Sequence, residues 1–134
     1  MLNRINDTLD FQGQALSLRS YRQRLIAGNI ANADTPGFVA RDFDFAQALR
    51  QAAGALGAGQ GATATHARHL GNGAADGAAP NLLYATPSQT NLDRNTVDMD
   101  RERAAFADNA VKYEATLRFI NGHVRTMLEA IKGQ

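Results

Sequence analysis

The 134-residue chain contains no cysteine and no tryptophan. The absence of cysteine excludes disulfide bonds, thiolate metal ligands and thiol catalysis, and it is compatible with a reducing or an oxidising compartment. Hydrophobic residues make up 44% of the sequence, but many of them are alanine, and the aromatic residues are six phenylalanines and three tyrosines. Few large side chains are therefore available to fill a globular interior, and we expect one functional unit with a thin core.

Concentrated charge and long apolar runs are also missing. The 14 basic and 13 acidic residues give a formal net charge of +1, whereas a nucleic-acid-binding protein gathers Lys and Arg on one face. We interpret the short run Arg19, Arg22 and Arg24 as a solvated or ion-paired helix face. No stretch approaches the roughly 20 apolar residues of a membrane span, and the N-terminus lacks the pattern of a signal peptide. We predict no nucleic-acid partner and no direct membrane span.

Motifs for catalysis or metal binding are not recognisable in the sequence. There is no nucleophile elbow, phosphate-binding loop or Ser/His/Asp arrangement, so we predict that the protein is not an enzyme and needs no cofactor. His66 and His69 could share a helix face, but no third ligand lies near them, so we interpret them as part of a solvated loop. The acidic residues between 93 and 102 do not fit an EF-hand loop, because Val97 occupies the fifth position.

The C-terminal segment predicts a long helix from Thr96 to about Lys132. Apolar residues follow alternating steps of four and three, which is a heptad seam suited to packing against another helix. The members of this seam are Phe106, Ala110, Tyr113, Leu117, Ile120, Val124, Met127 and Ile131. Asn95 or Thr96 is expected to cap the first amides of the helix. Gly122 interrupts it at a cost of about 1 kcal/mol relative to Ala, and we expect close helix approach or a bend there.

The N-terminal segment predicts a second, less regular helix up to about Ala33. Its seam positions are Ile5, Leu9, Gln12, Leu16, Arg19, Gln23, Ile26 and Ile30, and a further stripe contains Leu18, Tyr21 and Leu25. Because three seam positions are polar, we expect this helix to make contacts on more than one side. Pro36 and Gly37 then predict a type II turn, with Gly37 at the position that needs a positive φ.

The middle of the chain carries weaker signals. Residues 38–44 are expected to be extended and residues 45–53 to form a short helix. Between residues 51 and 80, 18 of 30 residues are Gly or Ala, which predicts a loop or a weakly ordered segment. The predicted organisation is a helix over 1–34, a connecting region over 35–94 and a helix over 95–134. The fold class is mainly α, with the two terminal helices paired as an antiparallel coiled coil.

A specific motif follows the first predicted helix. Its residues are Asn29, Asn32, Thr35, Pro36, Gly37 and Phe38. This pattern resembles the N-terminal signature of flagellar axial proteins, and residues 39–43 and 95–102 are similar to basal-body proximal rod subunits of the FlgB type. One departure is Arg94, which stands where that family usually has Gly, at a turn that needs a positive φ.

The resemblance implies a structural subunit that polymerises helically through its terminal helices. Its partners would be further copies of itself, other rod proteins, basal-body adaptor and membrane-ring proteins, and the flagellar type III export apparatus. The resemblance implies a rod that crosses the periplasm, with export that uses no cleaved signal peptide. Phe45 and Leu49 look like the short hydrophobic element that the export gate reads. The alternatives are a soluble helical adaptor or type III secretion chaperone that works as a closed dimer, and a neighbouring rod subunit.

Overall fold

The computed structural model describes residues 2–58, 80–84 and 92–133. Within them the elements are α1 (Leu2–Ala31), β1 (Arg41–Asp42), α2 (Phe45–Ala58), β2 (Leu83–Tyr84) and α3 (Met99–Lys132). The predicted mainly α fold with two long terminal helices is confirmed. No helix in these ranges combines the length and the apolar character needed to cross a bilayer.

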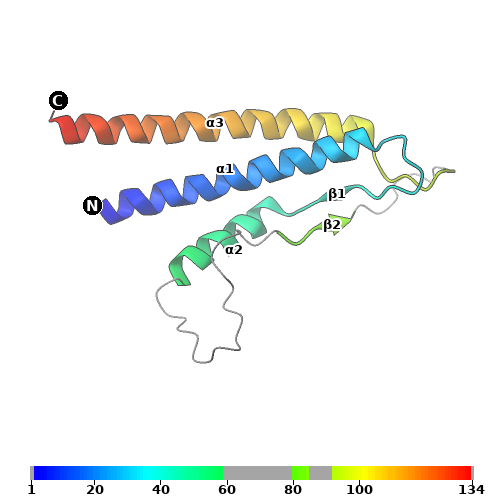
Figure 1. Ribbon diagram of the computed structural model, residues 1–134, viewed down its shortest axis with the longest axis horizontal. Helices are drawn as coiled ribbons and strands as arrows, with labels where there is room; N and C mark the ends of the chain where they lie inside the picture. The colour runs from blue at the N-terminus through cyan, green and yellow to red at the C-terminus, as the bar shows by residue number, and fades with distance from the viewer. Residues whose placement is uncertain (1, 59–79, 85–91, 134) are drawn as a thin grey trace, which may run out of the picture.

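The helices α1 and α3 run antiparallel and pack along one another, as predicted. Figure 1 shows both chain termini at the same end of the pair and the connecting turn at the other end. The two ribbons draw apart toward the termini. Burial follows the same trend, because the buried residues of α1 and α3 all lie between positions 15 and 29 and between 109 and 116. The pair is therefore closely packed in its middle and at its closed end, and open at the end that carries the termini.

The elements α2, β1 and β2 lie on the side of α1 that faces away from α3 (Figure 1). A small hydrophobic core forms there from Leu18, Phe43 and Ala48, with partly buried side chains packed around it. The rings of Tyr21 and Phe43 have centroids 5.7 Å apart and are tilted by 39°, a separation typical of favourable aromatic pairs. The sequence predicted that α1 makes contacts on more than one side, because three of its seam positions are polar. The structure agrees, since α1 packs against α3 on one side and against α2 and β1 on the other.

The sheet consists of the two short strands, which pair antiparallel. Arg41 is paired with Tyr84, and Asp42 with Leu83. The extended segment 38–44 was expected, whereas β2 was not, because its partner lies about forty residues earlier in the chain and leaves no local pattern.

The helix α2 is longer than expected. Its first turn is capped by Asp44, whose carboxylate accepts a hydrogen bond from the Gln47 N–H at 3.0 Å. The expected helix over 45–53 is present and continues to Ala58, so the expectation of a loop is wrong for residues 54–58. Alanine is the strongest helix former, and this outweighs the glycines in the stretch. The rest of the Gly/Ala tract up to residue 79, with His66 and His69, lies outside the described residues.

The start of α3 also differs from expectation. The helix begins at Met99, and its N-cap is Asp98, whose carboxylate accepts from the N–H groups of Asp100 and Arg101 at 3.1 and 3.2 Å. The prediction that Asn95 or Thr96 caps this helix is therefore wrong. Both side chains instead bind the turn at the end of α1, as described next.

Candidate functional site

The motif turn after α1 has the geometry that its sequence predicts. Gly37 has a φ of 72°, and the Phe38 N–H donates to the Thr35 carbonyl at 3.3 Å. The positive φ is required by a type II turn around Pro36 and Gly37, and the hydrogen bond is typical of one. The side chains of Thr35 and Pro36 are exposed, while Phe38 is half-buried.

Asn95 joins this turn to the start of α3. Its side-chain amide donates to the carbonyls of Asn32, Ala33 and Thr35 at 2.8–2.9 Å, and its side-chain oxygen accepts from the Val97 N–H at 2.8 Å. The carbonyls at the end of a helix have no partner within the helix. Asn95 therefore closes the end of α1 from more than sixty residues away in sequence.

Backbone bonds continue the same junction. The Gly37 N–H donates to the Asp93 carbonyl at 2.7 Å, and the Thr96 N–H donates to the Phe38 carbonyl at 3.0 Å. The Thr96 hydroxyl oxygen accepts from the Ala40 N–H at 2.9 Å. The two chain segments are thus held together by a short ladder built from main-chain and side-chain groups.

Asn29 and Asn32 complete the junction from the α1 side. The buried Asn29 side chain donates to the Arg41 carbonyl at 2.8 Å and accepts from the Arg41 N–H at 3.0 Å, as a paired strand would. The Asn32 side chain donates to the Gly28 carbonyl at 2.8 Å and accepts from the Thr35 hydroxyl at 3.1 Å. The motif asparagines thus use both ends of their amides, which explains why this residue type is present.

Arg94 adopts the backbone conformation that its position predicted. Its φ is 53°, the only positive value at a non-glycine residue among those described. A side chain in this region costs about 1–2 kcal/mol relative to glycine. The junction is therefore held against a local strain.

The junction continues into a charged group between α1, β1 and α3. The Arg22 guanidinium donates to both carboxylate oxygens of Asp42 at 3.0 and 2.9 Å, and this bond raises the pKa of Arg22. Burial raises the pKa of Glu102, a hydrogen bond with Asn29 opposes that rise, and the Asp42 carboxylate adds to it. The predicted ion-paired face is thus present at Arg22.

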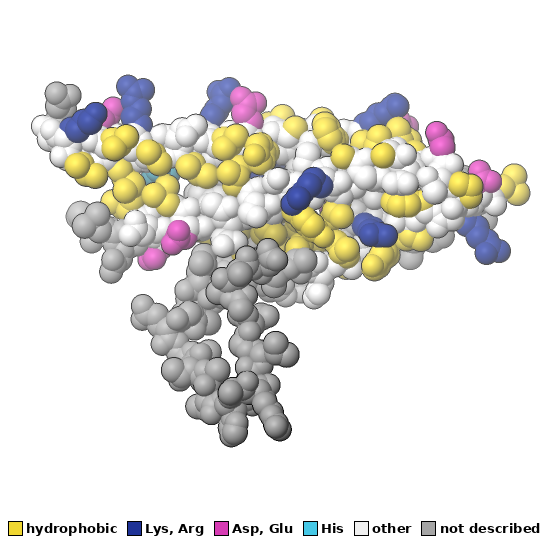
Figure 2. Space-filling view, in the orientation of Figure 1, with side chains coloured by type: hydrophobic (Ala, Val, Ile, Leu, Met, Phe, Trp, Pro, Cys, Tyr) yellow, Lys and Arg dark blue, Asp and Glu magenta, His cyan; other side chains and the backbone are white. Residues whose placement is uncertain are grey.

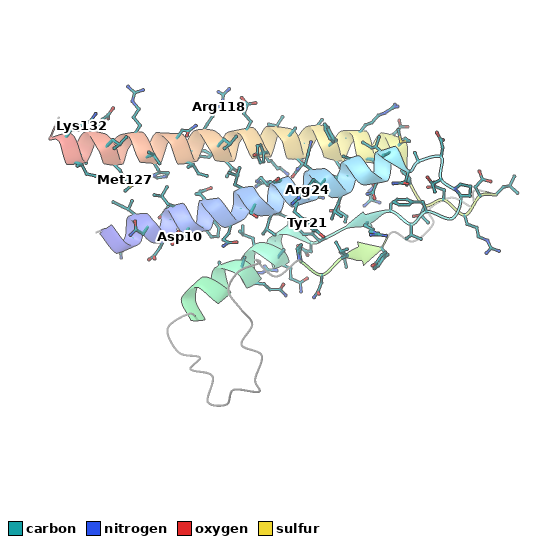
Figure 3. All side chains as sticks on the ribbon, in the orientation of Figure 1. Asp10, Tyr21, Arg24, Arg118, Met127 and Lys132 are labelled. Carbon is teal, nitrogen blue, oxygen red and sulfur yellow. The ribbon has the colours of Figure 1, made fainter. Side chains whose placement is uncertain are left out.

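The predicted seam residues divide into buried, half-buried and exposed positions. In α1, Ile26 is buried and Ile5, Leu9, Leu16 and Ile30 are half-buried. In α3, Tyr113, Leu117, Ile120 and Met127 are half-buried, whereas Phe106, Val124 and Ile131 are exposed. Figure 3 shows Met127 directed from α3 toward α1 and Arg118 directed away from it.

Two polar residues, rather than the apolar ones, lie at the centre of the α1–α3 contact. Asn109 is fully buried and Thr116 is 5% exposed. The Asn109 amide donates to the Arg19 carbonyl at 2.9 Å and to the Gln23 side-chain oxygen at 2.6 Å. The signal that could have found Asn109 is that Gln23 is a polar residue in the seam of the first helix and needs a partner. The bond to Arg19 uses its main-chain carbonyl and leaves no signal in the sequence.

Apolar side chains that are exposed or only half-buried form a continuous strip on α3. We call this strip the apolar flank, and its members are Phe106, Ala110, Leu117, Val124, Leu128 and Ile131. Ala110 and Leu117 are half-buried, and exposure then increases toward the C-terminus, from 41% at Val124 to 75% at Ile131. Figure 2 shows hydrophobic side chains gathered where the two terminal helices meet, toward the end that carries the termini.

Phe45 and Leu49 pack against the small core on the other side of α1. The Arg19 guanidinium lies 4.3 Å from the centre of the Phe45 ring, a cation–π distance. In the folded chain both side chains are therefore partly covered.

Comparison with known proteins gives one consistent match. The model of the family described as "Flagella basal body rod protein" matches residues 9–38, which include most of α1 and the motif turn. The chain is 48% identical to the flagellar basal body rod protein FlgB of Proteus mirabilis, with 98% of each chain covered. The corresponding identities are 44% for FlgB of Salmonella typhimurium, covering 99% of each chain, and 41% for FlgB of Escherichia coli, covering 98%. With identities at this level over nearly the full length of both chains, the chain belongs to the FlgB family of flagellar basal body rod proteins.

Proposed function

We propose that the chain is a structural subunit of the proximal rod of the bacterial flagellum, and that it polymerises helically through its terminal helices. It links the membrane-embedded ring to the distal rod and hook, and it performs no catalysis. The family membership supports the structural role. The observation that carries the polymerisation is the apolar flank on α3.

The apolar flank has the dimensions of a helix-packing surface. From Phe106 to Ile131 it extends about 37 Å at 1.5 Å per residue. Monomeric soluble proteins seldom expose a contiguous apolar strip of this length, which is typical of interaction sites. Since α3 makes heptad steps along the strip, the partner that fits it is another helix.

The outer face of α3 has a different character. Exposed ion pairs join Asp108 to Lys112, Glu114 to Arg118 and Arg125 to Glu129, each four residues apart. Pairs of this kind stabilise an isolated helix by a few tenths of a kcal/mol and suit a solvated surface. Phe119 and Val111 are also exposed outside the flank, at 62% and 68%. The flank is favoured as the contact with a neighbouring subunit because its apolar residues follow one another along the helix.

A heterologous contact of this kind gives an open helical assembly rather than a closed dimer. The further partners in this proposal are other rod proteins and the adaptor and membrane-ring proteins below them, reached as the rod crosses the periplasm. The type III export apparatus is the transient partner. Because Phe45 and Leu49 are packed in the folded chain, the export gate would read them from a chain that has not yet folded.

The test is a charge placed on the flank, with a matched control on the outer face. Val124 and Val111 are both exposed valines of α3, at 41% and 68%, and Val111 lies outside the flank. We expect Val124→Glu to abolish rod assembly and swimming while synthesis and export continue, because a buried unpaired charge in a helix contact is strongly unfavourable. Val111→Glu should retain most of the motility.

Equal swimming of the two variants would contradict the proposal. Measurements on purified protein separate it from the dimeric adaptor or chaperone. A dimer that melts cooperatively in dilute solution, and that dissociates when Val124→Glu is introduced, would favour that alternative. A protein that stays monomeric in dilute solution agrees with a rod subunit.

A further inference from the structure

We propose that Asn109 is a positioning residue that sets the rotation of α3 about its own axis, so that the apolar flank stays outside the contact with α1. The rotation inference rests on the α1–α3 contact alone. Its consequence for assembly rests on the function proposed above.

The rotation of α3 is not the one that apolar burial alone would select. At 3.6 residues per turn, Asn109 and Thr116 lie within about 20° of each other and define the line that faces α1. Phe106 lies about 60° to one side of Asn109, and Val124 lies about 80° to the same side of Thr116. A turn of α3 by that amount would bring Phe106 and Val124, which are now exposed, onto the line that faces α1.

The Asn109 amide opposes that turn. Its two hydrogen bonds reach across the contact, one to the Arg19 main-chain carbonyl and one to the Gln23 side chain. Both partners belong to α1, so the bonds form only when Asn109 points directly at that helix. A single buried asparagine at a helix contact is known to fix the alignment of the helices at some expense in stability.

Thr116 lies on the same line but contributes nothing to the rotation. Its hydroxyl donates to the Lys112 carbonyl of its own helix at 2.8 Å, a bond that α3 carries with it when it turns. Thr116→Ala is therefore a matched control for Asn109→Ala. Both changes reduce a buried polar side chain to a methyl group on the same face, and only one of them breaks a bond to α1.

The experiment uses single cysteines as reporters, since the chain has none of its own. Val124→Cys reports on the flank, and Ala105→Cys reports on the opposite edge of the contact, where Ala105 is half-buried. The rate of thiol alkylation is measured for each reporter in full-length dilute protein carrying Asn109, Asn109→Ala or Thr116→Ala. The helical circular dichroism signal confirms that each protein is folded.

Rotation predicts opposite changes at the two reporters. Loss of two bonds of ordinary net strength shifts the ratio of the two rotations by about fivefold or more. With Asn109→Ala, alkylation at position 105 should speed up by as much as about that factor and alkylation at position 124 should slow by a smaller factor, whereas Thr116→Ala should leave both rates unchanged. Faster alkylation at both positions would show that Asn109 only stabilises the pair, and unchanged rates would show that it does nothing; either result overturns the proposal. Because these measurements need no polymer, their outcome is separate from that of the rod assembly test.

Discussion

Replacement of Asn95 tests whether one side chain holds the two halves of the structure together. Asn95 is 6% exposed and donates to three carbonyls of the turn after α1. Its two amide hydrogens satisfy the equivalent of two hydrogen bonds, and its oxygen accepts a third from Val97. At about 0.5–1.5 kcal/mol for each bond, Asn95→Ala should lower the free energy of unfolding by about 2–4 kcal/mol.

Asn95→Asp sharpens the test, because it keeps the shape and the acceptor for the Val97 N–H but removes both donors. It also places a negative charge beside carbonyls at the negative end of the α1 dipole. We expect it to be at least as destabilising as Asn95→Ala at neutral pH, and to recover part of the loss in acid, where a protonated carboxyl can donate once.

The assay is urea unfolding followed by the helical circular dichroism signal. Asn121→Ala is the control, because Asn121 is exposed on α3 and surface changes of this kind stay within about 0.5 kcal/mol. A loss below about 1 kcal/mol for Asn95→Ala, or wild-type stability for Asn95→Asp at neutral pH, would refute the donor role.

Three further changes test the strain, the charge and the helix interior. Arg94→Gly should raise the free energy of unfolding by about 0.5–1 kcal/mol, since relief of the positive φ exceeds the added freedom of the unfolded chain; Arg94→Ala, which retains the strain, should give no gain in the same urea assay. Burial raises the pKa of Glu102, so its neutral form is favoured in the folded state and its ionisation destabilises the fold. Glu102→Gln should therefore increase stability at pH 7 by less than about 1 kcal/mol, and the gain should vanish below about pH 4, where the glutamate is protonated in both states; a constant gain across a pH series of unfolding curves would contradict this sign. Gly122 is exposed, and a Cβ there would meet nothing within 4 Å, so Gly122→Ala should stabilise α3 by about 0.5–1 kcal/mol in thermal unfolding. If that stabilised variant fails to swim, the glycine faces a neighbouring subunit rather than α1.

The sequence predicted the elements that depend on local pattern. The heptad steps over 106–131 indicate a helix, because this pattern is set by residues that are close together in the sequence. The turn at Pro36 and Gly37 was predicted for the same reason. The position of Arg94 was singled out only by the family resemblance, and the local pattern did not predict its positive φ.

Features that depend on distant partners could not be predicted in this way. Asn95 fits a local capping pattern, but its amide serves the carbonyls of another helix, and Asp98 takes the capping role. The rotation of α3 is a second case, since the heptad pattern alone does not tell that Asn109 has partners in α1. The strand β2 is a third, because two residues give no periodicity to detect.

The distribution of burial connects the fold to the proposed polymerisation. The closed end of the pair is held by directional bonds from Asn29 and Asn95, which function in a single chain without help from neighbours. At the open end, Leu128 and Ile131 are 50% and 75% exposed, and apolar burial there becomes available only when another helix arrives. The hydrogen bonds that fix the geometry of the single chain thus lie at the closed end. The exposed apolar surface lies at the open end, where contact with a neighbouring subunit would take place. A subunit built in the opposite way, with its apolar seam closed on α1, would be more stable alone and would offer less to the next subunit.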